Sequence, residues 1–190
     1  TSVLFQGKSL FKEIQNVITT LHQQGSSFTG LNDGKKLMQW ILQTAQTQIP
    51  WLKEDTTLGQ WKTEVEKENS SIKHLYIAVT NLHTGEPQLF STENEEDKDY
   101  CLLSLIRASL SIPIVFKPVK LRRITPRGKE ISRDDYVDGG LLANHLIAAF
   151  DTKKYTQQDA PGREDFRSFN KKTIGFAFTT SPVTRPPAGN

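Results

Sequence analysis

The chain has 190 residues, of which 36% are hydrophobic, and it carries 24 Lys and Arg against 21 Asp and Glu, for a formal net charge of +3. This length and apolar content suit one domain with its own core. The positive charge is small and scattered, and no basic block is interleaved with aromatic residues, so we expect no nucleic-acid partner. Mild attraction to an anionic membrane surface is compatible with this balance.

Cysteine content and hydropathy indicate the redox compartment of the protein and the kind of membrane contact it can make. The single cysteine, Cys101, cannot form an internal disulfide and lies in the apolar run 100–103. It therefore predicts a buried, inert thiol and a reducing compartment or a bacterial origin. No apolar run approaches the roughly 20 residues that span a bilayer, so any membrane contact is expected to be peripheral.

The two ends of the chain differ from the middle. Residues 3–7, Val-Leu-Phe-Gln-Gly, match most of the recognition site of a picornaviral protease used to remove purification tags, so we interpret residues 1–7 as a remnant of such a site. Residues 8–180 are predicted to form one domain. Residues 181–190 contain three prolines and are predicted to be a linker or tail.

Four segments in the first 110 residues are predicted to be helical. Residues 9–24 place apolar side chains three and four positions apart, and residues 35–47 do the same. Residues 57–64 predict a short capped helix, and residues 100–109 a further one that ends before Pro113. The apolar stripe of the second helix is predicted to face the core: Leu37, Met38, Ile41, Leu42 and Ala45.

The first predicted sheet segment is the short apolar run 75–80, which is typical of a strand buried on both faces of a mostly parallel sheet. Residues 83–86 predict a turn, and residues 88–90 an edge strand with Pro87 at its start. The acidic segment 92–99 is predicted to be a solvated surface loop.

Residues 120–135 alternate basic and apolar residues around a Pro-Arg-Gly turn, which predicts a hairpin. Its arginines are candidate contacts for phospholipid headgroups, although an ordinary solvated hairpin explains them equally well: Arg122, Arg123 and Arg127. Beyond the hairpin, residues 144–150 predict a helix, 151–169 a polar loop, and 172–179 a final strand.

The stretch that carries chemistry is 136–140, Tyr-Val-Asp-Gly-Gly. A short apolar strand ends in Asp138, and two glycines follow, which have no side chains and readily take positive φ. A second segment or a substrate can therefore approach the carboxylate closely. Asp-Gly alone is also a common turn signal, so the wider context must decide between a turn and a reactive site.

That context resembles the patatin family of lipid acyl hydrolases over roughly residues 30 to 180. The stretch 107–119, Arg-Ala-Ser-Leu-Ser-Ile-Pro-Ile-Val-Phe-Lys-Pro-Val, is similar to a family motif, and Asp-Gly-Gly follows it after a hairpin. The resemblance implies an α/β fold, the three-layer patatin-like arrangement with a mostly parallel sheet. It also implies a phospholipase A that cleaves lipid esters with a serine–aspartate dyad and no cofactor. Asp138 matches the aspartate, supported by Gly139 and Gly140.

The family's nucleophile is absent from the sequence. No Gly-x-Ser-x-Gly occurs, and the closest string, 25–30, has its second glycine one place too far along. We therefore expect the chain to supply the part of the domain after the nucleophile and to be inactive alone. Its expected partner is the N-terminal half of the same domain, which carries the serine and the glycine-rich oxyanion loop.

The resemblance extends to setting and partners. Some bacterial members are secreted effectors that stay silent until a host protein binds them, so it implies a place in the bacterial cytoplasm or in a host cell, and a host protein activator in the second case. A catalytically inactive scaffold that binds a protein partner or a membrane surface is the alternative function. The four histidines have no spacing typical of a metal site, so no metal is expected: His22, His74, His83 and His145.

Two further details concern the surroundings of the dyad. Asp134 and Asp135 precede the strand, so they are expected to cap the hairpin and to point away from Asp138. Asn144 and His145 stand where many family members have Asn-Asn-Pro, so the loop after the dyad is altered.

Overall fold

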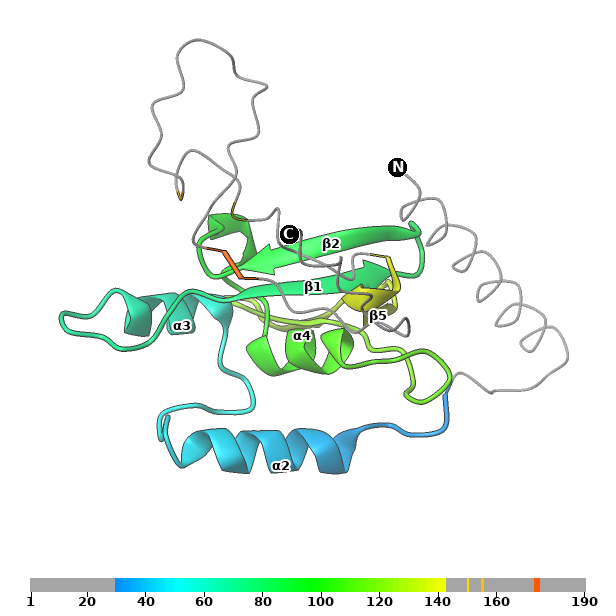
Figure 1. The fold of residues 1–190 in the computed structure, drawn as a ribbon, viewed down its shortest axis with the longest axis horizontal. Helices are drawn as coiled ribbons and strands as arrows, with labels where there is room; N and C mark the ends of the chain where they lie inside the picture. The colour runs from blue at the N-terminus through cyan, green and yellow to red at the C-terminus, as the bar shows by residue number, and fades with distance from the viewer. Residues whose placement is uncertain (1–29, 143–149, 151–154, 156–172, 175–190) are drawn as a thin grey trace, which may run out of the picture. The chain divides into compact units, whose positions relative to one another are not determined.

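The computed structural model describes residues 30–142 together with residues 150, 155, 173 and 174 (Figure 1). The chain divides into two compact units, residues 1–143 and 144–190. In the second unit, the rings of Phe150 and Tyr155 pack edge to face with their centroids 5.4 Å apart. The predicted helices 9–24 and 144–150, the string 25–30, the loop 151–169 and the strand 172–179 lie wholly or mostly outside the described residues, as do both chain ends.

In the first unit the described elements follow the predicted order. The helices are α2 (Lys35–Gln46), α3 (Leu58–Val65) and α4 (Leu102–Ser109), with short 3-10 helices η1 (Glu95–Asp97) and η2 (Gly139–Leu141). The strands are β1 (Tyr76–Asn81), β2 (Glu86–Ser91), β3 (Arg122–Thr125), β4 (Gly128–Ile131) and β5 (Tyr136–Asp138).

The main sheet has the strand order β2-β1-β5, with β1 in the centre. Both pairings are antiparallel, so the described strands do not show the mostly parallel sheet predicted from the sequence. The continuous apolar run of β1 reflects its central position between two antiparallel neighbours. A tight turn at Gly85, which has φ of 70°, reverses the chain into the edge strand β2 as predicted.

The core forms where α4 packs against β1 and β5 (Figure 1). Six of the eight residues of α4 are buried, and the thiol of Cys101 just before it is buried as predicted. The buried cluster draws on α3, α4, all three strands of the main sheet and the neighbouring connections: Leu52, Leu58, Trp61, Val79, Phe90, Leu102, Leu105, Ala108, Leu121 and Tyr136.

Helix α3 begins at a capping box, as its sequence predicts. The Thr57 hydroxyl accepts a hydrogen bond from the Gln60 amide, and the Gln60 side chain accepts one from the Thr57 amide. Helix α2 differs from its prediction, because none of its residues is fully buried. Leu42 and Ala45 pack against the core cluster from their half-buried positions, so the stripe of α2 is a margin of the core.

The acidic segment after β2 is more than a solvated loop. Asp97 is only 8% exposed, and its carboxylate accepts hydrogen bonds from the Ser91 amide at 2.9 Å and from the Asn94 side chain at 3.2 Å. Burial raises the pKa of Asp97 above its ordinary value, while these hydrogen bonds oppose the rise. The carboxylate therefore provides the acceptor for the last amide of β2, and keeping it charged in a buried position costs free energy.

This cost gives a prediction for pH dependence. An acid whose pKa is raised in the folded state favours unfolding above that pKa, and the effect is lost as pH falls and the group protonates in the fold. We expect Asp97→Asn to be at least as stable as the unchanged chain at pH 7, with the difference narrowing as the pH is lowered toward 4. Thermal unfolding followed by circular dichroism across this pH range measures it.

Asp97→Ala is the comparison variant. It leaves the Ser91 amide without its acceptor, so it should cost ~1–3 kcal/mol at pH 7. If Asp97→Asn were as destabilising as Asp97→Ala at every pH, the carboxylate charge would carry no penalty.

Candidate active site

Asp138 is held by hydrogen bonds to both its backbone amide and its backbone carbonyl. Its amide donates to the Ser111 carbonyl at 3.1 Å, and its own carbonyl accepts from the Thr80 hydroxyl at 3.0 Å. It lies opposite Val79 in the register of β1 and β5. The strand therefore fixes the position of Asp138 against the centre of the sheet.

The carboxylate of Asp138 is half-buried and oriented by the backbone that follows it. One oxygen, Oδ1, accepts a hydrogen bond from the Gly140 amide at 2.9 Å and so caps η2. No other hydrogen bond to this carboxylate is present within the described part of the chain. The side chain is thus held at one oxygen, which leaves the second oxygen for a further partner.

The two glycines serve this arrangement differently from the prediction. Neither has positive φ in the structure. Gly139 is buried, and a Cβ placed on it would lie 2.5 Å from the backbone carbon and oxygen of Ala78 in β1. The predicted close approach of a second segment is therefore present, and that segment is β1, while Gly140 supplies the amide that orients the carboxylate.

Arg107 links this region to the start of α2. Its side chain is 6% exposed and donates to the Asp33 carbonyl from Nε at 3.2 Å and from Nη2 at 3.1 Å. It also donates to the Ser111 hydroxyl at 2.6 Å and to the Lys117 carbonyl at 3.3 Å. Burial lowers the pKa of the Arg107 guanidinium, and the nearby Asp33 opposes this. One guanidinium thus joins two segments far apart in the sequence, the residues before α2 and the loop after α4.

The segment fixed by Arg107 is the one that holds β5. Ser111 accepts the Asp138 amide, and Val119 exchanges two backbone hydrogen bonds with Tyr136, at 2.9 and 2.8 Å. The side of β5 that faces away from β1 is therefore occupied by the residues after α4. In the described part of the sheet this leaves β2 as the outer strand.

The hairpin predicted at residues 120–135 is present as β3 and β4, but two of its three candidate arginines are committed to ion pairs. Arg122 pairs with Glu54 at 3.1 Å, and Arg123 with Asp99 at 3.6 Å. Arg127 lies exposed at the turn. The structure therefore does not bring the three guanidinium groups together as one headgroup site.

Asp134 and Asp135, which were expected to cap the hairpin, each have a partner in the structure, and only the partner of Asp135 belongs to the hairpin segment 120–135. The Asp134 carboxylate accepts a hydrogen bond from the Asn81 side chain at 2.9 Å, and Asp135 pairs with Lys120 at 3.5 Å. Within the described residues no group of three His, Cys, Asp or Glu side chains is placed to hold a metal ion.

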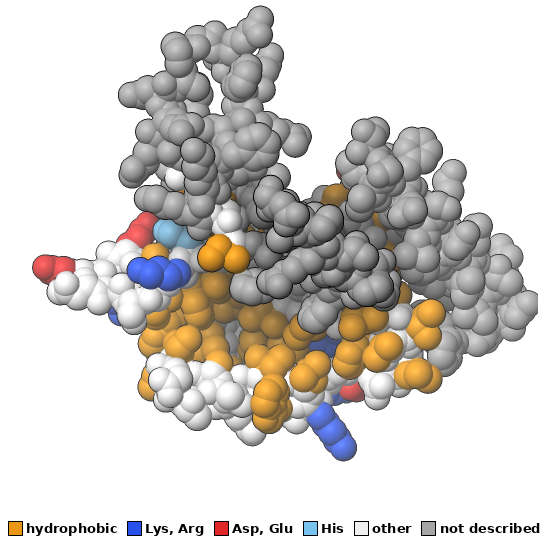
Figure 2. All heavy atoms as spheres, viewed as in Figure 1, with side chains coloured by type: hydrophobic (Ala, Val, Ile, Leu, Met, Phe, Trp, Pro, Cys, Tyr) orange, Lys and Arg blue, Asp and Glu red, His pale blue; other side chains and the backbone are white. Residues whose placement is uncertain are grey.

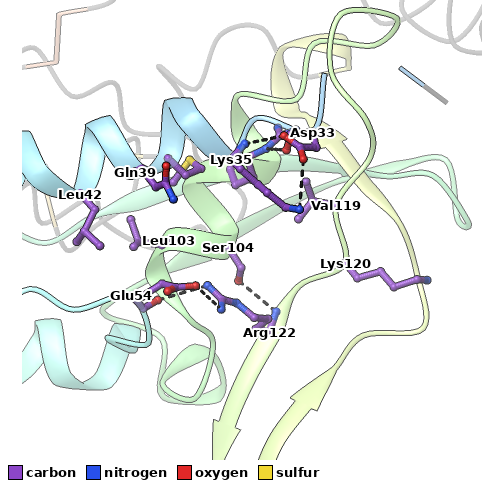
Figure 3. Close-up of a pocket in the computed structure, with 12 residues that line it drawn as sticks. Asp33, Lys35, Gln39, Leu42, Glu54, Leu103, Ser104, Val119, Lys120 and Arg122 are labelled. Carbon is purple, nitrogen blue, oxygen red and sulfur yellow. Dashed lines mark hydrogen bonds and ion pairs between the residues drawn. The ribbon is translucent and has the colours of Figure 1, made fainter. Parts of the chain in front are cut away.

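A cavity of about 360 Å³ lies between α2 and α4 (Figure 3). Met38 and Leu42 from α2 and Leu103 from α4 line its apolar part. It explains why the apolar stripe of α2 is only half-buried. Asp138 is not among its described lining residues, so the cavity is separate from the candidate dyad position.

Most charged groups around this cavity have partners: two ion pairs lie at its rim, and Arg107 donates to carbonyl and hydroxyl oxygens. Figure 3 shows Lys35 paired with Asp33 and Arg122 paired with Glu54, at 3.4 and 3.1 Å. Lys120 points away from the other lining side chains in the same view. The cavity therefore offers an apolar space whose rim charges are already compensated.

The model of the patatin-like phospholipase family matches residues 6–151 of the chain. The chain belongs to the patatin-like phospholipase family. This confirms the resemblance drawn from residues 107–119 and 138–140, and membership implies an α/β fold and the hydrolysis of lipid esters. No curated protein matches the chain significantly. No described helix is both long and apolar enough to cross a membrane.

Two residues of this patatin-like phospholipase that position Asp138, Arg107 and Ser111, were not singled out from the sequence. Both lie inside the quoted family motif, and their spacing of four places them on one side of a helix end. That spacing was the available signal. Arg107 is a buried arginine whose hydrogen-bond acceptors include the carbonyl groups of Asp33 and Lys117. Those two residues meet only in the folded chain, so this role could not be predicted from the spacing.

We expect Arg107→Lys to lower the free energy of unfolding by ~3 kcal/mol, because an ammonium group cannot reach Asp33, Ser111 and Lys117 at once and hydrogen bonds from a buried charge are lost. Denaturant unfolding of the purified protein measures this. Arg127→Lys at the exposed hairpin turn is the matched control and should change stability by less than ~0.5 kcal/mol. Similar values for the two variants would show that the buried guanidinium does not hold the fold.

Proposed function

We propose that the protein is a phospholipase of the A type in which Asp138 is the carboxylate of a serine–aspartate dyad. The observation that carries the proposal is the state of this carboxylate. The strand and Ser111 fix its backbone, Gly140 holds one oxygen, and the other oxygen has no described partner. An aspartate in that state is suited to accept a proton directly, which a dyad without histidine requires.

The serine of this dyad must come from outside the 190 residues, because Gly-x-Ser-x-Gly is absent from them. We propose that the segment carrying it and the glycine-rich oxyanion loop completes the three-layer, mostly parallel sheet. In that arrangement the serine hydroxyl meets the second oxygen of Asp138, passes its proton to that carboxylate and attacks the acyl carbon of the ester. The acyl C–O bond then breaks, and the departing lysophospholipid alcohol takes the proton from Asp138. Water, deprotonated by the same carboxylate, finally hydrolyses the acyl-enzyme, which releases the fatty acid and returns the proton to the serine.

The substrate class follows from the family and is a lipid ester. We propose a phospholipid acyl chain, presented at a membrane surface to which the protein binds peripherally. No residue described here identifies a protein activator, and the proposal does not require one.

The direct test is Asp138→Asn in the full-length protein. The amide cannot take a proton but can still accept a hydrogen bond from Gly140, so the fold should persist while hydrolysis of a soluble short-chain ester falls by ~100-fold or more. Initial rates of ester hydrolysis, together with a thermal melt, give both readouts.

Asp135→Asn is the matched control, because Asp135 is three residues away and, among the described residues, its carboxylate pairs with the exposed Lys120 alone. It should retain the unchanged rate. If Asp138→Asn retained the rate as well, Asp138 would have no part in the mechanism, and the scaffold function would gain support if the unchanged protein also lacked activity.

A further inference from the structure

The loop that follows α4 exposes an unusual concentration of large apolar side chains. Leu110, Ile112, Ile114 and Val115 are 39%, 52%, 59% and 42% exposed, and Leu31, 66% exposed, is joined to the same loop by a hydrogen bond from its amide to the Ile114 carbonyl. We refer to residues 110–115 with Leu31 as the apolar loop. Figure 2 shows hydrophobic side chains across the described part of this face, including the end where the loop after α4 lies in Figure 1.

The apolar loop is held firmly in this exposed state. The Asn32 amide donates to the Val115 carbonyl at 3.0 Å, and the Lys117 amide donates to the Asn32 carbonyl at 2.9 Å. Beneath it, the Arg107 guanidinium lies over the Phe116 ring, 4.9 Å from its centroid. The exposure of the apolar side chains is therefore fixed by the same contacts that organise the core.

Ile114 stores strain in this loop. Its φ is 75°, a left-handed conformation that is a genuine outlier for a β-branched residue. Glycine or asparagine would adopt it at lower cost, so stability alone does not explain an isoleucine that is also largely exposed. The isoleucine side chain is therefore best explained by a contact with another molecule or surface.

The charges beside the apolar loop favour an anionic surface as that contact. Residues 31–36 and 110–117, which include the apolar loop, contain three exposed lysines, Lys35, Lys36 and Lys117, against the single aspartate Asp33. Lys35 pairs with Asp33 at 3.4 Å, so Lys36 and Lys117 carry the positive charge that this pair does not balance. Exposed apolar side chains with an excess of lysines in the same segments are the pattern of a peripheral contact with anionic lipid.

We infer that the apolar loop docks the protein on an anionic lipid surface by inserting Leu31, Ile112 and Ile114 among the acyl chains while the lysines meet the headgroups. This deepens the proposed function, on which it rests, by naming the surface from which the substrate is taken. Ser111, between Leu110 and Ile112, bonds the Asp138 amide. The docking residues and the candidate catalytic carboxylate are therefore joined by one hydrogen bond.

This assignment differs from the headgroup contacts expected of the hairpin. There Arg122 and Arg123 are engaged by Glu54 and Asp99, and the exposed apolar residue is Ile131, at 65%. Ile131 therefore provides a matched control: an isoleucine of similar exposure, on β4 and outside the apolar loop.

The test is flotation of the full-length protein with vesicles in a density gradient, which separates bound protein from aggregates because aggregates sink. Vesicles of phosphatidylcholine with about one third phosphatidylglycerol are compared with vesicles of phosphatidylcholine alone. The unchanged protein should float mainly with the anionic vesicles, and less at high salt. The double variant Ile112→Ser with Ile114→Asn should bind at least ~10-fold more weakly, whereas Ile131→Asn should bind as the unchanged protein does.

Two further readouts decide what a loss means. Ile114→Asn alone should melt at the same or a higher temperature, because asparagine relieves the strain, and hydrolysis of a soluble ester should be unaffected. Asp138→Asn should float normally even though it is inactive, so a failure of the proposed dyad and a failure of lipid docking are separately visible.

The inference is overturned if the unchanged protein does not float, if the double variant floats equally well, or if Ile131→Asn loses as much binding. It is also overturned if Ile114→Asn lowers the melting temperature or the rate on a soluble ester, because the loop would then pack against protein.

Discussion

The described structure depends on the buried guanidinium of Arg107. A charge with so little exposure must be matched by hydrogen bonds, and here the acceptors are the Asp33 and Lys117 carbonyls and the Ser111 hydroxyl. Meeting that requirement draws the start of α2 and the loop after α4 to one point. Gly34, with φ of 70° and no room for a Cβ beside the guanidinium, is a consequence of the same requirement. The backbone carbonyl of Ser111, held in this loop, then accepts a hydrogen bond from the amide of Asp138.

The elements that local signals specify were predictable from the sequence. The capped helix that starts after Thr57, the turn at Gly85 and the hairpin around residues 126–128 appear as expected, because each depends on neighbouring residues alone. The direction of the strands was not predictable in this way. The apolar run of β1 indicates that the strand is buried, but it does not indicate the strand's direction, because a central antiparallel strand can be buried as fully as a parallel one.

The candidate site shows the same division. The motif singles out Asp138 as a candidate, and its role in catalysis stays a prediction. The reason given for Gly139 was wrong in part, because this residue lies against Ala78 without positive φ. The arginines of the hairpin looked equivalent in the sequence, yet Glu54 and Asp99 engage two of them. Long-range partners decide both outcomes, and these follow from the tertiary fold.

We propose that Asp138 directly assists a serine supplied by the rest of the catalytic domain. An alkyl phosphonate ester forms a covalent adduct with an activated serine, so a crystal structure of the full-length protein after this reaction shows which serine that is. We expect one modified serine, in Gly-x-Ser-x-Gly, whose oxygen lies about 3 Å from the Asp138 carboxylate. A modified serine out of reach of Asp138, or one paired with a histidine, would show that Asp138 is not the activating group.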